Sequence, residues 1–143
     1  MRDLSNAQPL LQVEDLRVSL PTARGWAQAL RGVSWCMERG QTVGLIGESG
    51  SGKSLTALAL MGLLPERARV GGSIALQGQE LVGLPEPQLC QLRGSRMAMI
   101  FQEPMTALNP LHPIWKQIAE PLRLHQHMSA SDAKARALQL LER

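Results

Sequence analysis

Polar residues separate the apolar positions early in the chain, and two later runs are mainly apolar. The separated apolar positions are Leu11, Val13, Leu16 and Val18, followed by Val33, Trp35 and Met37, which alternate with a period of two. This pattern predicts two half-buried strands, over residues 11–18 and 33–37. The uninterrupted runs, at residues 42–46 and 97–101, are typical of strands buried on both faces of a sheet. A shorter strand is expected over residues 74–76.

Four other segments carry the signals of helices. Residues 54–64 contain good helix formers and stop before a proline. Residues 85–94 have a proline near the first turn and a glycine past the end, which predicts a short helix. A third helix begins at Pro113. The last follows the capping-box sequence Ser129-Ala-Ser-Asp132, and it reaches Arg143 without a stop signal.

Composition places the chain among globular proteins. Of its 143 residues, 44% are hydrophobic and 19% charged, so composition does not predict disorder. The formal net charge is +3, and the arginines are scattered rather than gathered in a basic run. With one Phe, three Trp and no Tyr, few side chains could stack on unpaired bases. We therefore expect no nucleic-acid partner.

The cysteines and the longest uncharged stretches indicate the compartment. Cys36 and Cys90 lie far apart in sequence, with no C-x-x-C spacing, and are expected to be reduced thiols of a cytosolic protein. No uncharged stretch approaches the ~20 residues of a membrane helix. The first residues lack the apolar core of a signal peptide. The chain itself is expected neither to cross nor to enter a membrane.

The sequence Gly47-Glu-Ser-Gly-Ser-Gly-Lys-Ser54 matches the pattern G-x-x-x-x-G-K-S/T in full. A predicted strand precedes it and a predicted helix follows, which is the setting of a phosphate-binding loop. Glycines let several backbone N–H groups converge on one anion, and the helix N-terminus adds its dipole. Lys53 is expected to reach the β- and γ-phosphates, and the Ser54 hydroxyl to bind Mg²⁺. A nucleotide kinase, a GTPase and a transport ATPase would all contain such a loop.

The stretch Met99-Ile-Phe-Gln102-Glu-Pro-Met-Thr-Ala-Leu-Asn-Pro110 distinguishes these classes. It resembles the Q-loop of ABC-transporter ATPases, and in particular that of the dipeptide, oligopeptide and nickel importer subfamily. The phosphate loop and the segment Gly72–Gly78 are also similar to that subfamily. The resemblance runs from about Leu10 to Arg143. It argues against a kinase or a GTPase, and neither Asn6 nor Asn109 starts a guanine-reading N-K-x-D motif.

The resemblance implies an α/β fold of the P-loop NTPase class, present as an incomplete ABC nucleotide-binding domain. Residues 10–110 would hold an antiparallel β segment, the P-loop core and the Q-loop, and residues 111–143 the start of the helical subdomain. The implied cofactors are ATP and Mg²⁺, with Gln102 near the metal and the attacking water. The implied nucleotide contacts are Gly47, Glu48, Ser49, Gly50, Ser51, Gly52, Lys53 and Ser54. Lys53 and Gln102 are the implied catalytic residues, and Ser54 and Gln102 the metal ligands.

An aromatic residue upstream of the phosphate loop stacks on adenine in this family. Trp26 is the candidate in this sequence, although a simple register puts Arg24 nearer to the expected position. Packing of the Trp26 indole against the sheet is the alternative interpretation. Both interpretations remain open at the level of the sequence.

Several elements of the family's site are not found in this sequence. There is no LSGGQ-like signature, and no acidic residue after the phosphate loop follows four apolar residues. The three histidines lie before any position suited to the family's switch histidine. These observations predict the N-terminal portion of an ABC ATPase, cut inside its helical subdomain. Such a chain is expected to bind MgATP weakly, to hydrolyse little of it, and to be poorly soluble alone because of an unpaired strand edge.

The resemblance also implies partners and a location. The subunit would work with the transporter's membrane subunits and a second ATP-binding subunit, at the inner face of the cell membrane. Its function would be to couple ATP hydrolysis to the uptake of peptides or nickel. The alternative from a different class is a nucleotide-binding remnant or regulatory module that occupies a transporter without turnover.

Overall fold

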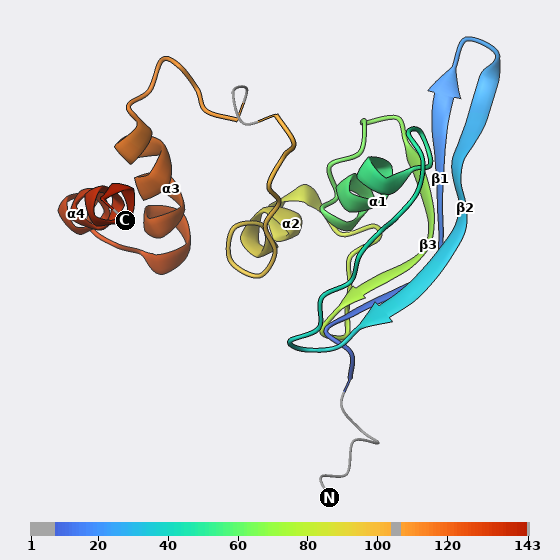
Figure 1. Cartoon of the computed structure of the whole chain (residues 1–143), viewed down its shortest axis with the longest axis horizontal. Helices are drawn as coiled ribbons and strands as arrows, with labels where there is room; N and C mark the ends of the chain where they lie inside the picture. Colours follow the sequence, from blue (N-terminus) through green and yellow to red (C-terminus); the bar gives the residue numbers. More distant parts are fainter. Residues whose placement is uncertain (1–7, 104–106, 143) are drawn as a thin grey trace, which may run out of the picture. The chain divides into compact units, whose positions relative to one another are not determined.

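The computed structural model describes residues 8–103 and 107–142. It divides into two compact units, an N-terminal unit (Met1–Leu89) and a C-terminal unit (Cys90–Arg143). The N-terminal unit contains a sheet and a helix that follows the glycine-rich loop (Figure 1). The C-terminal unit is built mainly from two helices. A short helix, α2 (Glu86–Leu92), spans the boundary between the units, close to the helix predicted over residues 85–94.

Four antiparallel strands form the sheet in the order β2-β1-β3-β4. They are β1 (Leu11–Thr22), β2 (Gly25–Met37), β3 (Arg69–Leu76) and β4 (Gln79–Glu80). The predicted strands at 11–18, 33–37 and 74–76 are therefore confirmed, and each is longer than its alternation indicated. The pairing of β1 with β2 changes register at three places, which bends and twists the strands.

The core of the N-terminal unit lies on one face of this sheet. Leu16 and Val18 are fully buried, and Val13 and Ile74 are exposed by only 1%. Val13 and Leu16 are three residues apart, and the register shift between them, with Asp15 at a φ of 47°, keeps both on the core face of β1. Figure 1 shows α1 (Lys53–Leu60) beside the sheet. Arg17 and Ser19 of β1 lie on the other face of the sheet, together with Trp26 of β2.

The two uninterrupted apolar runs do not form the buried strands that their composition predicts. Residues 42–46 contain no strand, and residues 97–101 take part only through a bridge from Met97 to Arg93. Ile46 is 100% exposed and Ile100 is 98% exposed. A strand buried on both faces needs neighbours along both edges. Within the described residues, no strand of the sheet pairs with either run.

Helix α1 is shorter than the predicted 54–64 segment. It ends at Leu60, with Met61 as the C-cap, and Gly62 follows with a φ of 63°. A left-handed glycine just past a helix terminates it by turning the chain away from the axis. The stop therefore comes from the glycine inside the predicted segment and not from the proline that follows it.

The C-terminal unit contains a helical hairpin, α3 (Ile114–Gln126) and α4 (Ala130–Leu141). Its buried centre is small, and Trp115, Ile118, Leu122 and Met128 pack around it. The buried residues are Ala119, Ala133 and Ala137. The predicted cap of α4 is confirmed, because the Ser129 hydroxyl accepts a hydrogen bond from the Asp132 N–H at 3.2 Å. Among the described helices, none combines the length and apolar character of a membrane span.

Candidate functional site

The glycine-rich loop forms a tight turn immediately before α1. The Ser51 N–H donates a hydrogen bond to the Glu48 carbonyl at 3.2 Å, which closes the turn. Gly50 and Gly52 have φ angles of 79° and 94°. Residues with a side chain rarely adopt this left-handed conformation, so the two glycines permit the path of the loop. Alternation of left-handed and ordinary residues turns successive N–H groups to one side, as in anion-binding nests.

The N-terminus of α1 has no side-chain cap. Gly52 is its N-cap residue, and no side chain there accepts a hydrogen bond from the first turn. The helix begins with the Thr56 N–H donating to the Gly52 carbonyl at 2.8 Å. Its first turn contains no acidic residue. The unpaired N–H groups and the positive end of the helix dipole therefore face the loop, where they favour an anion.

Strand β2 packs against the N-terminus of α1. A Cβ placed on Gly52 would lie 2.5 Å from Leu30 Cδ2 and 3.7 Å from the Ala29 carbonyl oxygen. Leu30 is buried, with 4% of its surface exposed. The loop thus rests directly on a core residue of the sheet. This contact was not predicted from the sequence, because nothing in the pattern of either segment identifies the other as its neighbour.

The Lys53 ammonium lies over the loop. Lys53 Nζ donates to the Gly47 carbonyl at 2.7 Å and to the Glu48 carbonyl at 2.8 Å, with the Ser51 hydroxyl at 3.4 Å. A positive charge is therefore held at the concave side of the turn, next to the uncapped end of α1. The Ser54 side chain is exposed in the first turn of the same helix. The structure thus brings together the predicted residues of the phosphate loop.

This arrangement suits the phosphates of a nucleotide. Backbone N–H groups, a helix N-terminus and an ammonium group are the donors that phosphate oxygens require. A hydroxyl one residue further along the helix can supply one oxygen ligand to Mg²⁺, which otherwise takes phosphate oxygens and water. Among residues 8–103 and 107–142, no group of three or more His, Cys, Asp or Glu side chains could hold a metal ion.

Gln102 belongs to the C-terminal unit, whereas the phosphate loop belongs to the N-terminal unit. Its side chain is exposed, and it follows Phe101, which is 51% exposed. Residues 104–106 of the predicted Q-loop lie outside the described residues. The predicted approach of Gln102 to the metal therefore stays a prediction.

Strand register fixes the face on which Trp26 lies. Trp26 of β2 is directly opposite Pro21 of β1, which lies two residues after Ser19, so Trp26 shares the face of Pro21 and Ser19. Val18 points to the opposite, buried face, together with its partner Leu30. Because Leu30 contacts the phosphate loop, Trp26 lies on the face of the sheet away from that loop.

The Trp26 ring already has a partner on the outer face. The Arg69 guanidinium lies over it, 3.8 Å from the ring centroid, and 47% of Trp26 is exposed. This geometry favours the packing interpretation of Trp26 over stacking on adenine. The contact with Arg69 was not predicted from the sequence. It forms because β1 pairs with β2 along one edge and with β3, which carries Arg69, along the other.

Comparison with known proteins adds independent information. A model of the family described as "ABC transporter" matches residues 30–143. The oligopeptide transport ATP-binding protein OppD of Escherichia coli is 45% identical over 136 residues, covering 95% of this chain and 40% of that protein. The probable D,D-dipeptide transport ATP-binding protein DdpD of Escherichia coli is 48% identical over 137 residues, covering 94% and 42%. The chain thus spans about two fifths of the length of these relatives.

Solved structures with the same fold include two of the dimeric ATP-binding cassette MJ0796. One is a post-hydrolysis state bound to ADP and Pi, with a TM-score of 0.76 and 22% identity, covering 92% of this chain and 56% of that one. The other is a bacterial ABC transporter cassette, with a TM-score of 0.77. At this identity the likeness shows the fold alone. It confirms the predicted P-loop class and the partial cassette, and with the family match it establishes that this chain belongs to the ABC transporter family.

Proposed function

We propose that this chain binds MgATP through Gly47–Ser54 as the ATP-binding part of an importer of short peptides. The observation that carries the proposal is the uncapped N-terminus of α1 with the Lys53 ammonium beside it. A site built in this way is positively polarised and has no acidic residue in the first helical turn. It selects a multiply charged phosphate chain over a neutral or cationic ligand.

Binding of the phosphates would require Lys53 to exchange hydrogen-bond partners. Lys53 donates to the two loop carbonyls at 2.7 and 2.8 Å and to the Ser51 hydroxyl at 3.4 Å, which uses all three donors of its ammonium group. A phosphate oxygen at the concave side of the loop would take at least one of these donors. Charge-assisted bonds to phosphate are stronger than bonds to a neutral carbonyl. The exchange is therefore favourable, and the loop is held in shape until it occurs.

The proposed metal ligands are the Ser54 hydroxyl and the Gln102 amide oxygen. When bound, Mg²⁺ would neutralise charge on the β- and γ-phosphates. An amide at Gln102 could accept from the attacking water without adding negative charge beside the phosphates. Gln102 would also connect occupancy of the nucleotide site to the membrane subunits.

The peptide cargo and the assembly are inferred from the relatives. Two of them are named for oligopeptide and D,D-dipeptide transport, so we favour a peptide over nickel. The dimeric cassettes support pairing with a second ATP-binding subunit. The chain would then act at the inner face of the cell membrane, against membrane subunits that select the cargo. The alternative is a nucleotide-binding remnant or regulatory module that occupies a transporter without turnover.

The experiment is titration of the purified chain with MgATP by calorimetry. The chain has three lysines, so Lys53→Ala can be compared with Lys116→Ala, which removes an exposed lysine of α3. Loss of a charge-assisted contact worth about 1.5–3 kcal/mol should weaken binding about tenfold to hundredfold in Lys53→Ala. Lys116→Ala should bind like the parent chain. No binding by the parent at millimolar MgATP, or equal affinity of both variants, would overturn the proposal.

A further inference from the structure

Three arginines gather on the outer face of the sheet, the face away from α1. Arg17 of β1 is directly opposite Arg31 of β2, and Ser19, two residues further along β1, is directly opposite Arg69 of β3. Residues opposite each other share a face, and so do residues two apart on one strand. Arg17, Arg31 and Arg69 therefore form one cluster, the arginine face, and all three are exposed.

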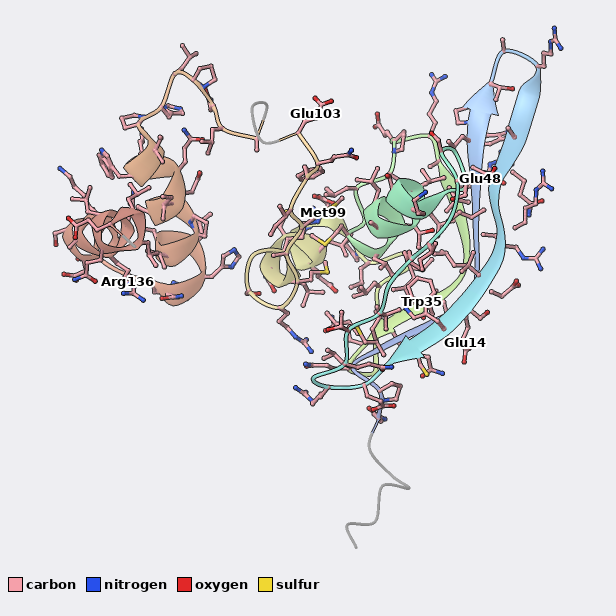
Figure 2. All side chains as sticks on the ribbon, viewed as in Figure 1. Glu14, Trp35, Glu48, Met99, Glu103 and Arg136 are labelled. Atoms are coloured by element: carbon pink, nitrogen blue, oxygen red, sulfur yellow. The ribbon has the colours of Figure 1, made fainter. Side chains whose placement is uncertain are left out.

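The positive charge of this cluster is only partly compensated within the chain. Asp15 pairs with Arg17 at 3.0 Å. Figure 2 shows Glu14 on the side of the sheet opposite to Trp35, but Glu14 accepts a hydrogen bond from Gln12 at 2.7 Å. Within residues 8–103 and 107–142, neither Arg31 nor Arg69 has a carboxylate partner. Because Asp15 already offsets the charge of Arg17, Arg31 and Arg69 are the two arginines of this face whose charge an anionic partner would compensate.

The arginine side chains are also partly ordered before any partner binds. The Arg69 guanidinium rests on the Trp26 ring at 3.8 Å, and both Asp15 carboxylate oxygens accept from Arg17 Nε at 3.0 Å. Holding a guanidinium in place reduces the entropy that is lost when it binds a carboxylate. Planar guanidinium groups match carboxylates in a two-pronged geometry.

The geometry points to this arginine face as a docking surface for an acidic segment of a polypeptide. Neighbouring strands are about 4.8 Å apart and alternate residues on one strand about 6.6 Å apart, so the backbone positions of Arg17, Arg31 and Arg69 are separated on the scale of alternate residues of an extended chain. A membrane surface fits less well, because Trp26 is the one large apolar side chain among these residues and Arg69 already covers it. The three register shifts also bend this face, whereas a bilayer is flat.

Docking here is separable from the proposed nucleotide site. Leu30 contacts the phosphate loop from the buried face, whereas Arg31, the next residue, belongs to the outer face. Variants on the arginine face should therefore keep their MgATP affinity. If the chain failed to bind nucleotide, the docking result would still stand. If it failed to bind the acidic peptide, the nucleotide result would still stand.

The test measures binding of a fluorescent poly-glutamate peptide to the whole chain by anisotropy. A peptide of about ten residues is longer than the cluster, since each extended residue covers about 3.3 Å. The variants are Arg31→Gln and the double variant Arg31→Gln/Arg69→Gln. The matched control is Arg136→Gln, because Figure 2 places Arg136 on α4, in the C-terminal unit. Circular dichroism of each variant checks that the sheet is intact.

We expect the parent chain to bind the peptide, with affinity falling as salt rises. Arg31→Gln should weaken binding, the double variant should weaken it about fivefold or more, and Arg136→Gln should not change it. Equal losses in Arg136→Gln, or no binding by the parent at low salt, would overturn the proposal. So would binding to vesicles containing phosphatidylglycerol, or to a single-stranded oligonucleotide, that exceeds binding to the peptide.

Discussion

Individual glycines of the phosphate loop serve different physical purposes, and this difference can be measured. Gly50 and Gly52 both have left-handed φ angles, of 79° and 94°. Around Gly50 there is open space, whereas a Cβ on Gly52 would lie 2.5 Å from the buried Leu30 side chain. Gly50→Ala should therefore cost only the backbone strain, about 1–2 kcal/mol. Gly52→Ala should cost more, because Leu30 must also move.

Urea unfolding of the two alanine variants checks this order. The Leu30 atom concerned is the end of a flexible side chain, so the additional cost is expected to be smaller than the strain itself. A free energy of unfolding that falls equally in both variants would show that the contact with β2 does not constrain the loop.

Trp26 provides the second test at the residue scale. Its ring lies on the outer face beneath Arg69, so its removal should leave the MgATP affinity within about twofold of the parent value. Stacking of an aromatic side chain on a base is worth about 1–3 kcal/mol, so a stacking residue would lose at least about fivefold. Calorimetric titration of Trp26→Ala distinguishes packing from stacking on adenine. A loss of MgATP affinity of about fivefold or more would support stacking.

Among the secondary-structure elements, those with local signals were the most predictable. The alternation around Val13 and the capping box at Ser129 each depend on residues close in sequence, and both predictions are confirmed. The phosphate loop was predictable for the same reason. The runs 42–46 and 97–101 require distant strands as neighbours, and a local pattern does not specify whether these are present. The contact of Gly52 with Leu30 and the position of Arg69 over Trp26 also depend on long-range pairing.

The β3–β4 hairpin makes a prediction about pH. Burial raises the pKa of Glu80, but hydrogen bonds from Ser73 and from the N–H groups of Ile74, Val82 and Leu81 outweigh it and lower the pKa below its ordinary value of 4.5. A carboxylate with a lowered pKa stabilises the folded state above its ordinary pKa, and this stabilisation is lost as the pH falls through the lowered value.

Glu80→Gln should therefore be less stable than the parent chain at pH 7, by less than about 1 kcal/mol because water screens this exposed carboxylate. The difference should shrink as the pH falls from 4.5 through the lowered pKa of Glu80, below which the glutamate of the folded parent is also neutral. Thermal unfolding of both chains, measured at several pH values between about pH 3 and pH 7, would test this. If the two chains differed in stability by the same amount at every pH, the cause would be altered packing or hydrogen bonding and not the charge of Glu80.

For the whole molecule, the separation of binding from hydrolysis is the central expectation. The N-terminal unit holds the phosphate loop, and Gln102 lies in the other unit. An amide such as Gln102 can orient the attacking water, but removal of its proton by a general base needs a positioned carboxylate. No acidic residue after Ser54 follows the apolar run that would place such a base at the end of a buried strand.

The 143-residue chain should therefore bind MgATP without releasing phosphate above the level of buffer. Phosphate release is measured on the chain at saturating MgATP, with Lys53→Ala as the blank for contaminating ATPases. Because the two samples differ only in the side chain of residue 53, a contaminant would give the same rate in both. Turnover well above background that disappears in Lys53→Ala would show that these residues already contain a complete hydrolytic site. In that case a side chain other than a carboxylate at a strand end, with Gln102 the first candidate, would have to position the attacking water.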